Sequence, residues 1–189
     1  ASDSGSGVSA LYVKSPNSSS YLSAGTSTTI ASTATNGLYS FYAKDKAGNI
    51  SRTYFLYLDT VKPTGKIKNS NGTEITGSYT NQTFSYSATD SGSGISYLQY
   101  RKPGSSSWLT YTSGTSISAS ATSGTYQFRA VDNAWNISAT KSITLDSSRP
   151  TMTLYSGDVS VSNGYKSIAN YIKATATDSG SGVKTIYVK

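Results

Sequence analysis

Aspartate is the residue type in this sequence whose spacing could support chemistry. Seven of the nine acidic residues occupy just three positions of a recurring pattern. The first position holds Asp3, Asp90 and Asp178, the second holds Asp45 and Asp132, and the third holds Asp59 and Asp146. Carboxylate oxygens are ligands that Ca²⁺ prefers in proteins. The function of these acids therefore depends on which of them the fold brings together.

Enzymatic chemistry has little support in the remaining residues. The chain contains no His and no Cys, so it has no conventional catalytic triad, no thiol nucleophile and no zinc site. A single Glu argues against a glycosidase pair unless two Asp residues serve instead. The segment Gly5-Ser6-Gly7 has neither the lysine nor the strand-to-helix context of a phosphate-binding loop. We therefore expect a protein that is not an enzyme.

A domain-sized internal repeat organises the whole sequence. Asp3-Ser-Gly-Ser-Gly7 recurs as Asp90-Ser-Gly-Ser-Gly94 and as Asp178-Ser-Gly-Ser-Gly182, at offsets of 87 and then 88 residues. Between the first two copies the register holds without a gap, because Gly37–Asp45 aligns with Gly124–Asp132. Self-similarity at a fixed period is the signature of a repeat architecture.

Apolar and polar residues alternate inside each repeat, which is the period-2 pattern of half-buried strands. Tyr126, Phe128 and Ala130 are predicted to face inward, as are Phe84 and Tyr86 of an earlier strand. Trp108 is expected to fill the middle of the core. Turn residues delimit seven expected strands, at 64–69, 82–89, 95–102, 107–111, 115–121, 125–132 and 137–145. The predicted fold class is all-β, with tandem immunoglobulin-like β-sandwich repeats of about 87 residues and roughly seven strands each.

These landmarks resemble the bacterial Ig-like tandem repeats of surface proteins and adhesins. The resemblance covers the whole chain and rests on the Asp-Ser-Gly-Ser-Gly segments, on Gly37–Asn49 with its counterpart Gly124–Asn136, and on Pro63-Thr64 with Pro150-Thr151. It implies an extracellular location at a bacterial cell surface and a role as a structural spacer, stalk or adhesin repeat. The implied partners are neighbouring copies or adjacent repeats of the same protein.

The repeat register predicts the domain organisation. Residues 1–14 and 176–189 occupy the same place in the repeat. We therefore expect a partial domain over 1–58, a complete domain over 59–146, and a second partial domain over 147–189. An isolated half-sandwich exposes its core face and unpaired strand edges. Two hypotheses follow: the chain is an excerpt of a longer array, or the last strands of one copy complete the first strands of another and assemble the protein end to end.

The predicted topology places the loop after 82–89, the loop after 125–132 and the linker before 64–69 at the same end of the sandwich. Such a grouping resembles the Ca²⁺-stabilised joints of some bacterial adhesins and cadherin-like proteins. The candidate Ca²⁺ ligands are Asp59, Asp90, Asp132 and Asn136, with Asp146 and Asp178 at the next junction. The alternative is that these residues only organise tight turns, since Asp and Asn side chains bond nearby backbone amides. No other cofactor is expected.

Exposed aromatic residues support a second function, which is binding of carbohydrate or another ligand by a secreted module. Tyr12, Tyr42 and Trp135 are the candidate contacts, with cell-wall or host glycans as candidate ligands. Sheet stabilisation is the alternative role for the tyrosines, and packing against the neighbouring domain is the alternative role for Trp135. Trp135 stands where Gly48 stands in the first copy, so we expect that this turn does not demand a glycine-only φ.

The net charge of +7 could indicate nucleic-acid binding, but the Lys and Arg residues are scattered along the chain. We therefore expect no nucleic-acid partner. No stretch approaches the ~20 continuous apolar residues of a membrane-spanning helix, so we expect no direct membrane insertion.

Overall fold

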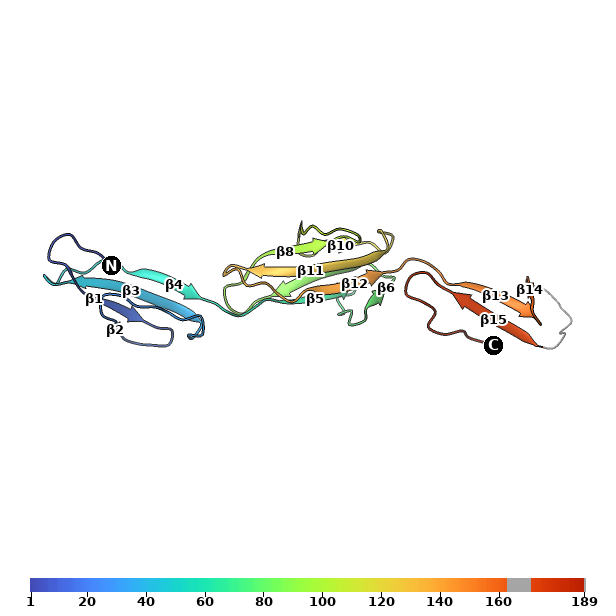
Figure 1. Ribbon diagram of the computed structural model, residues 1–189, viewed down its shortest axis with the longest axis horizontal. Helices are drawn as coiled ribbons and strands as arrows, with labels where there is room; N and C mark the ends of the chain where they lie inside the picture. The colour runs from blue at the N-terminus through green and yellow to red at the C-terminus, as the bar shows by residue number, and fades with distance from the viewer. Residues whose placement is uncertain (163–170, 189) are drawn as a thin grey trace. The chain divides into compact units, whose positions relative to one another are not determined.

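The computed structural model describes residues 1–162 and 171–188, and the regular structure of these residues consists of β-strands (Figure 1). Because the described residues form no helix, none of their segments qualifies as a helix that could cross a membrane. The all-β class predicted from the alternating pattern is therefore confirmed, with several antiparallel sheets. The boundaries of the three predicted domains remain a prediction.

The chain divides into two compact units. The first comprises residues 1–64, 88–97 and 130–139, and the second comprises 65–87, 98–129 and 140–189. Strands β8 (Ile95–Arg101) and β11 (Gly124–Asp132) contribute residues to both units.

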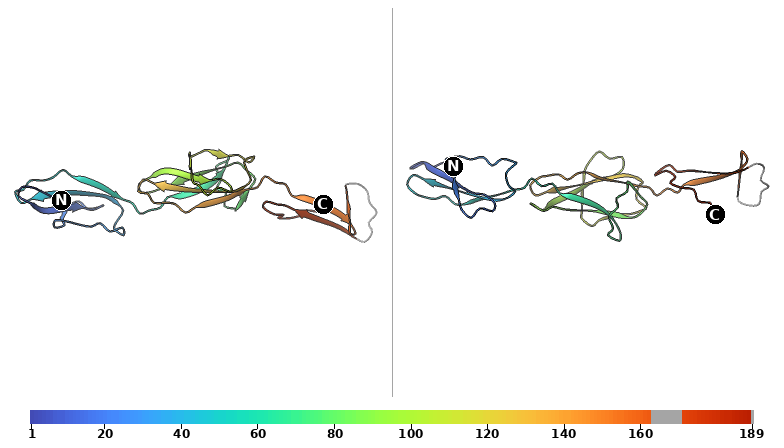
Figure 2. Two further views of the ribbon diagram at one scale, coloured as in Figure 1. Left: turned by 45° about the horizontal axis from the view of Figure 1, so that its top comes forward. Right: turned by 90° about the horizontal axis from the view of Figure 1, so that it is seen from below.

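The first unit contains a four-stranded antiparallel sheet in the order β2-β1-β3-β4 (Figures 1 and 2). Its strands are β1 (Val8–Lys14), β2 (Leu22–Ser23), β3 (Gly37–Asp45) and β4 (Tyr54–Leu58). In the pairing of β1 with β3, Leu11 lies opposite Ala43 and Val13 opposite Phe41. These pairs lie on one face of the sheet, since residues two apart in a strand point the same way.

Residues 64–145 form two sheets. The three-stranded sheet β10-β7-β5 consists of β5 (Thr64–Asn69), β7 (Phe84–Thr89) and β10 (Ser116–Ile117). The five-stranded sheet β6-β12-β11-β8-β9 adds β6 (Tyr79–Thr80), β9 (Leu109–Tyr111) and β12 (Lys141–Leu145) to β8 and β11. The short strand β6 joins the edge of β12 in parallel and was not predicted.

Aromatic rings from both sheets meet in the core of residues 64–145. Phe84 on β7 contacts Tyr126 and Phe128 on β11, with ring centroids 5.6 and 6.2 Å apart, and Tyr86 stacks on Phe128 at 5.1 Å. Phe84, Tyr86 and Phe128 are fully buried. The inward rows predicted from the alternating pattern are therefore confirmed, because two apolar sheet faces become shielded from water by facing each other.

The prediction for Trp108 is wrong. Its side chain is only half-buried, and the guanidinium groups of Arg101 and Arg129 lie over its ring, at 4.3 and 4.2 Å from the ring centre. Two cations over an indole ring are a favourable arrangement at a partly wet surface. Tyr111 occupies the core instead and contacts Phe128 at 5.3 Å.

A tyrosine near the start of β3 and another at the start of β11 make the same contact. The Tyr39 hydroxyl donates to the carbonyl oxygen of Thr35 at 2.9 Å, and the Tyr126 hydroxyl donates to that of Thr122 at 3.0 Å. Each bond reaches back four residues, so each tyrosine fixes the turn that leads into its strand.

Residues beyond 150 form a three-stranded antiparallel sheet in the order β14-β13-β15. Its strands are β13 (Thr151–Ser156), β14 (Val159–Val161) and β15 (Ile172–Thr177). Leu154 lies opposite Ala174 and Met152 opposite Ala176. Residues 178–188 form no strand.

Candidate functional site

The three Asp-Ser-Gly-Ser-Gly loops share one local structure. In each loop the Asp carboxylate accepts the backbone N–H groups of both glycines, at 2.8 to 3.1 Å. The acids that do this are Asp3, Asp90 and Asp178. A carboxylate that binds amides two and four residues ahead closes the loop without any other partner. The loop-organising role predicted for Asp90 is therefore confirmed, and Asp3 and Asp178 have the same role.

Asp132 organises the turn that follows β11. Its Oδ1 accepts the N–H groups of Ala134 and Asn136 at 2.9 and 2.8 Å, and its Oδ2 accepts the Asn136 side-chain amide at 2.8 Å. Asp45 accepts both N–H groups of Asn49 in the same way, at 2.7 Å each. Charge-assisted bonds from Asn49 are the largest influence on Asp45 and lower its pKa.

Asp59, in the linker between β4 and β5, makes a contact that its sequence neighbourhood does not reveal. Its Oδ2 accepts the backbone N–H of Ser93 at 2.6 Å, and its Oδ1 accepts that of Val61 at 2.9 Å. A Cβ at Gly92 would overlap the Asp59 carboxyl group. Glycine at this position therefore lets the linker acid reach the loop. We call this contact of a linker acid with a loop glycine and serine the linker clamp.

The linker clamp recurs at the second linker. Asp146 Oδ2 accepts the backbone N–H of Ser181 at 2.6 Å, and a Cβ at Gly180 would overlap the Asp146 carboxyl group. Hydrogen bonds from Ser148 and Ser181 hold the pKa of Asp146 well below its usual range. In the first loop, by contrast, a Cβ at Gly5 would meet only the Asp3 carboxylate of its own loop, at an ordinary 3.5 Å.

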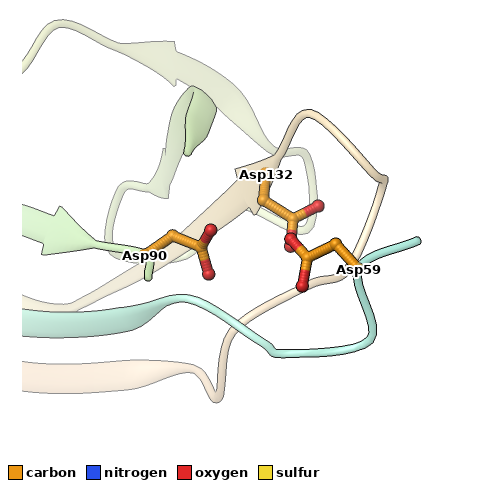
Figure 3. Close-up of side chains that lie close together, drawn as sticks. All are labelled: Asp59, Asp90 and Asp132. Atoms are coloured by element: carbon orange, nitrogen blue, oxygen red, sulfur yellow. The ribbon is translucent and has the colours of Figure 1, made fainter. Parts of the chain in front are cut away.

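Three of the predicted calcium ligands converge (Figure 3). One carboxylate oxygen from each of Asp59, Asp90 and Asp132 lies within 4.8 Å of the other two. Calcium binds oxygen at 2.3–2.6 Å, so oxygens that share one ion lie at most about 5 Å apart. The spacing therefore fits a single Ca²⁺ ion. Asp59 and Asp132 are buried, and Asp90 is half-buried.

The hydrogen bonds leave one oxygen of this cluster without a partner. Asp90 Oδ2 accepts the two loop amides, whereas Asp90 Oδ1 is shielded from solvent and accepts no hydrogen bond from the part of the chain that the structure describes. A shielded carboxylate oxygen without a donor costs free energy unless a proton or a cation compensates it. Asp90 Oδ1 is thus the atom of the cluster that could gain most from a bound cation.

The negative charge of the three carboxylates also favours a bound cation. Two unit charges 4 Å apart repel by about 4 kcal/mol at an effective dielectric constant of 20. Burial acts to raise the pKa of Asp59, but hydrogen bonds from Ser93 and Val61 outweigh it and leave that pKa below its ordinary value. Asp59 therefore stays ionised close to two other carboxylates. In residues 1–162 and 171–188, the ion pair present joins Lys66 to Glu74 at 3.0 Å and does not involve the cluster.

The remaining predicted ligands take other positions. The Asn136 side-chain N–H₂ donates to Asp132 and to the carbonyl oxygen of Asp59 at 3.0 Å, so this amide ties the turn to the linker. Asp146 and Asp178 both contact the third Asp-Ser-Gly-Ser-Gly loop. Among the described residues, the set of three carboxylates that converges is the one at Asp59.

The predicted ligand-contact aromatics fall into two groups. Tyr12 and Tyr42 are cross-strand neighbours whose rings stack at 4.8 Å, and Tyr21 packs edge-on against Tyr42 at 4.8 Å. This cluster is half-buried, as expected for sheet stabilisation. Trp135 is different, because 74% of it is exposed and its ring lies edge-on to Tyr97 at 6.2 Å.

The expectation about the Trp135 backbone is wrong. Trp135 has a φ of +68° and Gly48 has a φ of +98°, so the turn does require the left-handed region in both copies. The N–H of Trp135 bonds the carbonyl oxygen of Asp132 at 3.2 Å, as Gly48 bonds Asp45. A bulky residue in this region is strained, and such strain accumulates at functional positions.

Gly92 and Ser93 are functional residues that sequence reasoning missed. The signal that could have revealed them is the recurrence of Gly and Ser at these two positions in all three loops, beyond what an Asp-led turn needs. The comparisons with known proteins add nothing to this geometry, because no family model, curated protein or solved structure matches the chain.

Proposed function

We propose that this chain belongs to a tandem array of immunoglobulin-like β-sandwich repeats that serves as a structural spacer, stalk or adhesin repeat outside a bacterial cell. The observation that carries the proposal is the recurrence of the linker clamp. Asp59 binds Ser93 and Asp146 binds Ser181 with the same atoms and the same 2.6 Å distance. A protein that restrains each linker where the next repeat begins is suited to transmit force or to hold a ligand away from a surface.

The two sheets of residues 64–145 support the immunoglobulin-like part of the proposal. Their strand order, the buried aromatic core and the corner tyrosine Tyr126 are features of that sandwich class. Strands β1, β3 and β4 of the first sheet occupy the repeat positions of β8, β11 and β12. Strands β13 and β15 of the third sheet occupy the repeat positions of β5 and β7. A repeat protein built in this way gains length by adding units, without new chemistry in each unit.

Single-molecule pulling tests the mechanical role. With the chain tethered at both ends, we expect one force peak that releases roughly 80 residues, or roughly 270 Å of contour length. Phe128→Ala should lower the peak force because it empties the core, whereas Phe41→Ala in the first sheet is the matched control and should not. Extension without any force peak contradicts the mechanical role.

Antibody labelling tests the location. An antibody raised against residues 59–146 should label intact cells of the source organism. Labelling that needs permeabilised cells contradicts the extracellular location.

Within this proposal, Asp59, Asp90 and Asp132 form a Ca²⁺ site at the linker. The supporting observations are the 4.8 Å grouping and the shielded, unpartnered Asp90 Oδ1. Calcium at one hundred times its dissociation constant would stabilise the folded form by about 2.7 kcal/mol. The melting temperature of residues 59–146 should therefore rise with millimolar calcium.

Asp90→Asn is the informative variant for this site, because an amide oxygen still accepts the loop N–H groups while the charge is lost. It should abolish the calcium response, whereas the matched variant Asp3→Asn should retain it. A melting temperature that is the same with calcium and with a chelator removes the calcium proposal and leaves the structural role intact.

Ligand binding through Trp135 is the second candidate function. The observation in its favour is an indole that is 74% exposed and held at a φ of +68°. An exposed, rigidly presented aromatic ring can stack on the apolar face of a sugar. Binding to a glycan array that disappears in Trp135→Ala but persists in Tyr12→Ala would support this candidate. An array without any bound glycan would exclude it for the glycans tested.

A further inference from the structure

The first sheet leaves part of an apolar face exposed, which we call the open face. Cross-strand register places Leu11, Val13, Phe41, Ala43 and Leu56 on it, together with Tyr39, which is itself buried. Leu56 lies 87 residues before Ile143 and occupies the same place in the repeat. Leu56 is 55% exposed, whereas Ile143 is 1% exposed. Within residues 1–162 and 171–188, no second sheet packs on Leu56 as one does on Ile143 in residues 64–145.

The sheet after residue 150 leaves the complementary face uncovered, which we call the donor face. Register places Met152, Leu154, Ile172, Ala174 and Ala176 on it. Ile172 corresponds to Phe84 at an offset of 88 residues. Ile172 is 63% exposed, whereas Phe84 is 1% exposed because it packs between Tyr126 and Phe128.

Residues 64–145 show how two such faces fit together. There, β7 of the three-stranded sheet packs on β11 of the five-stranded sheet. By the repeat offsets, β13 and β15 are the counterparts of β5 and β7, whereas β1, β3 and β4 are the counterparts of β8, β11 and β12. The open face and the donor face are thus the two halves of one such pair.

Side-chain sizes on the donor face also fit a packed interior. In residues 64–145, Gly65 must lack a Cβ because the Tyr86 ring fills that space. On the donor face, Met152 stands in place of Gly65 and Ala174 in place of Tyr86. The large residue moves from one strand to its neighbour while the combined volume stays similar, and volume-conserving exchanges are those that packed cores tolerate.

From these observations we propose that the donor face of one copy packs on the open face of a second copy, and that repetition of this contact links copies head to tail. A contact between two different faces does not close on itself and so produces open-ended chains. The proposal rests on the repeat architecture of the proposed function and names the partner as a second copy of this chain. Residues 183–188, which form no strand, are left out of the contact because β1 of the partner copy takes the corresponding place.

Two variants block one face each. Phe41→Lys places a charge on the open face, and Leu154→Lys places a charge on the donor face. Tyr57→Lys and Thr153→Lys are the controls. Tyr57 lies on the opposite face of the first sheet, on the neighbouring strand β4, and Thr153 is adjacent to Leu154 on the opposite face of β13. Fluorescence of the two tryptophans, Trp108 and Trp135, reports separately on residues 59–146 and verifies that each variant keeps that region folded.

Size-exclusion chromatography with light scattering over a range of protein concentrations is the test. The unaltered chain and both control variants should increase in mass with concentration. Each face variant alone should remain a monomer, and a one-to-one mixture of the two should form a dimer and nothing larger.

Three outcomes overturn the proposal. An unaltered chain that is monomeric at every concentration removes the contact. Dimers of Leu154→Lys alone mean that open faces pair with each other, and dimers of Phe41→Lys alone mean that donor faces do. In all three cases an unchanged tryptophan unfolding transition leaves the proposed structural role standing, whereas loss of that transition in the unaltered chain contradicts both proposals.

Discussion

Gly92→Ala is the substitution that tests the linker clamp most directly. The new methyl group would overlap the carboxyl group of Asp59. That carboxylate is only 6% exposed and is held by two backbone amides, so it has little room to move aside. We expect the side chain to leave Ser93, and the bond from a backbone amide to a charged group contributes about 1.5–3 kcal/mol.

Alanine also reduces the freedom of the unfolded chain, which offsets roughly 0.4–1 kcal/mol of that loss. The φ of Gly92 lies outside the left-handed region, so alanine adds no backbone strain there. The net destabilisation is then about 1–2 kcal/mol. For a domain of about 80 residues this lowers the melting temperature by about 5–15 °C.

Tryptophan fluorescence during thermal unfolding is the assay, because Trp108 and Trp135 both lie within residues 59–146. Gly5→Ala is the matched control, since the same loop position in the first copy meets no linker acid. A Gly92→Ala protein that melts at the same temperature as Gly5→Ala would refute the clamp as a source of stability.

Three further predictions address the same region. Folding lowers the pKa of Asp59, so its contribution to stability is complete above the unfolded pKa, near pH 4, and declines as the pH falls through the lower folded value. The free energy of unfolding should therefore decrease less steeply with falling pH in Asp59→Asn than in the unaltered chain. An unchanged pH profile contradicts this. Trp135→Gly should raise the melting temperature by up to several degrees, because the left-handed backbone conformation costs a bulky residue about 1–2 kcal/mol. The neighbouring control Ala134→Gly should lower the melting temperature. Equal effects of the two substitutions would disprove strain at Trp135. Tyr126→Phe removes the bond to Thr122 and should cost about 1 kcal/mol in urea unfolding followed by tryptophan fluorescence, whereas Tyr39→Phe should leave that transition in place.

The inward rows could be predicted because alternation depends only on neighbouring residues. The range 64–69 matches β5, and Phe84 and Phe128 are buried as expected. Short edge strands were predicted less well, since β10 covers only Ser116–Ile117 of the range 115–121. Its pairing with β7 is limited to two residues, and pattern alone does not set where pairing stops.

The candidate site was predictable in part. The predicted topology alone placed Asp59, Asp90 and Asp132 at one end of the sandwich, because the directions of the strands determine which loops and linkers lie at each end. The bond from Ser93 to Asp59 was not predictable, since it depends on the path of the linker in space. The Trp135 conformation was missed because the presence of a bulky residue was taken as a sign of an ordinary φ, whereas the turn imposes the left-handed region on whichever residue stands there.

The exchange of Gly65 and Tyr86 for Met152 and Ala174 bears on how the polypeptide avoids errors during synthesis. Neighbouring near-copies on one nascent chain can trade strands and become trapped in misassembled forms. If β13 took the place of β5 beside β7, the thioether of Met152 would collide with the phenol ring of Tyr86, since that ring leaves no room for even a Cβ at Gly65. Such intruding pairings are penalised by shape, so β5 is retained beside β7 although β13 occupies the same place in the repeat.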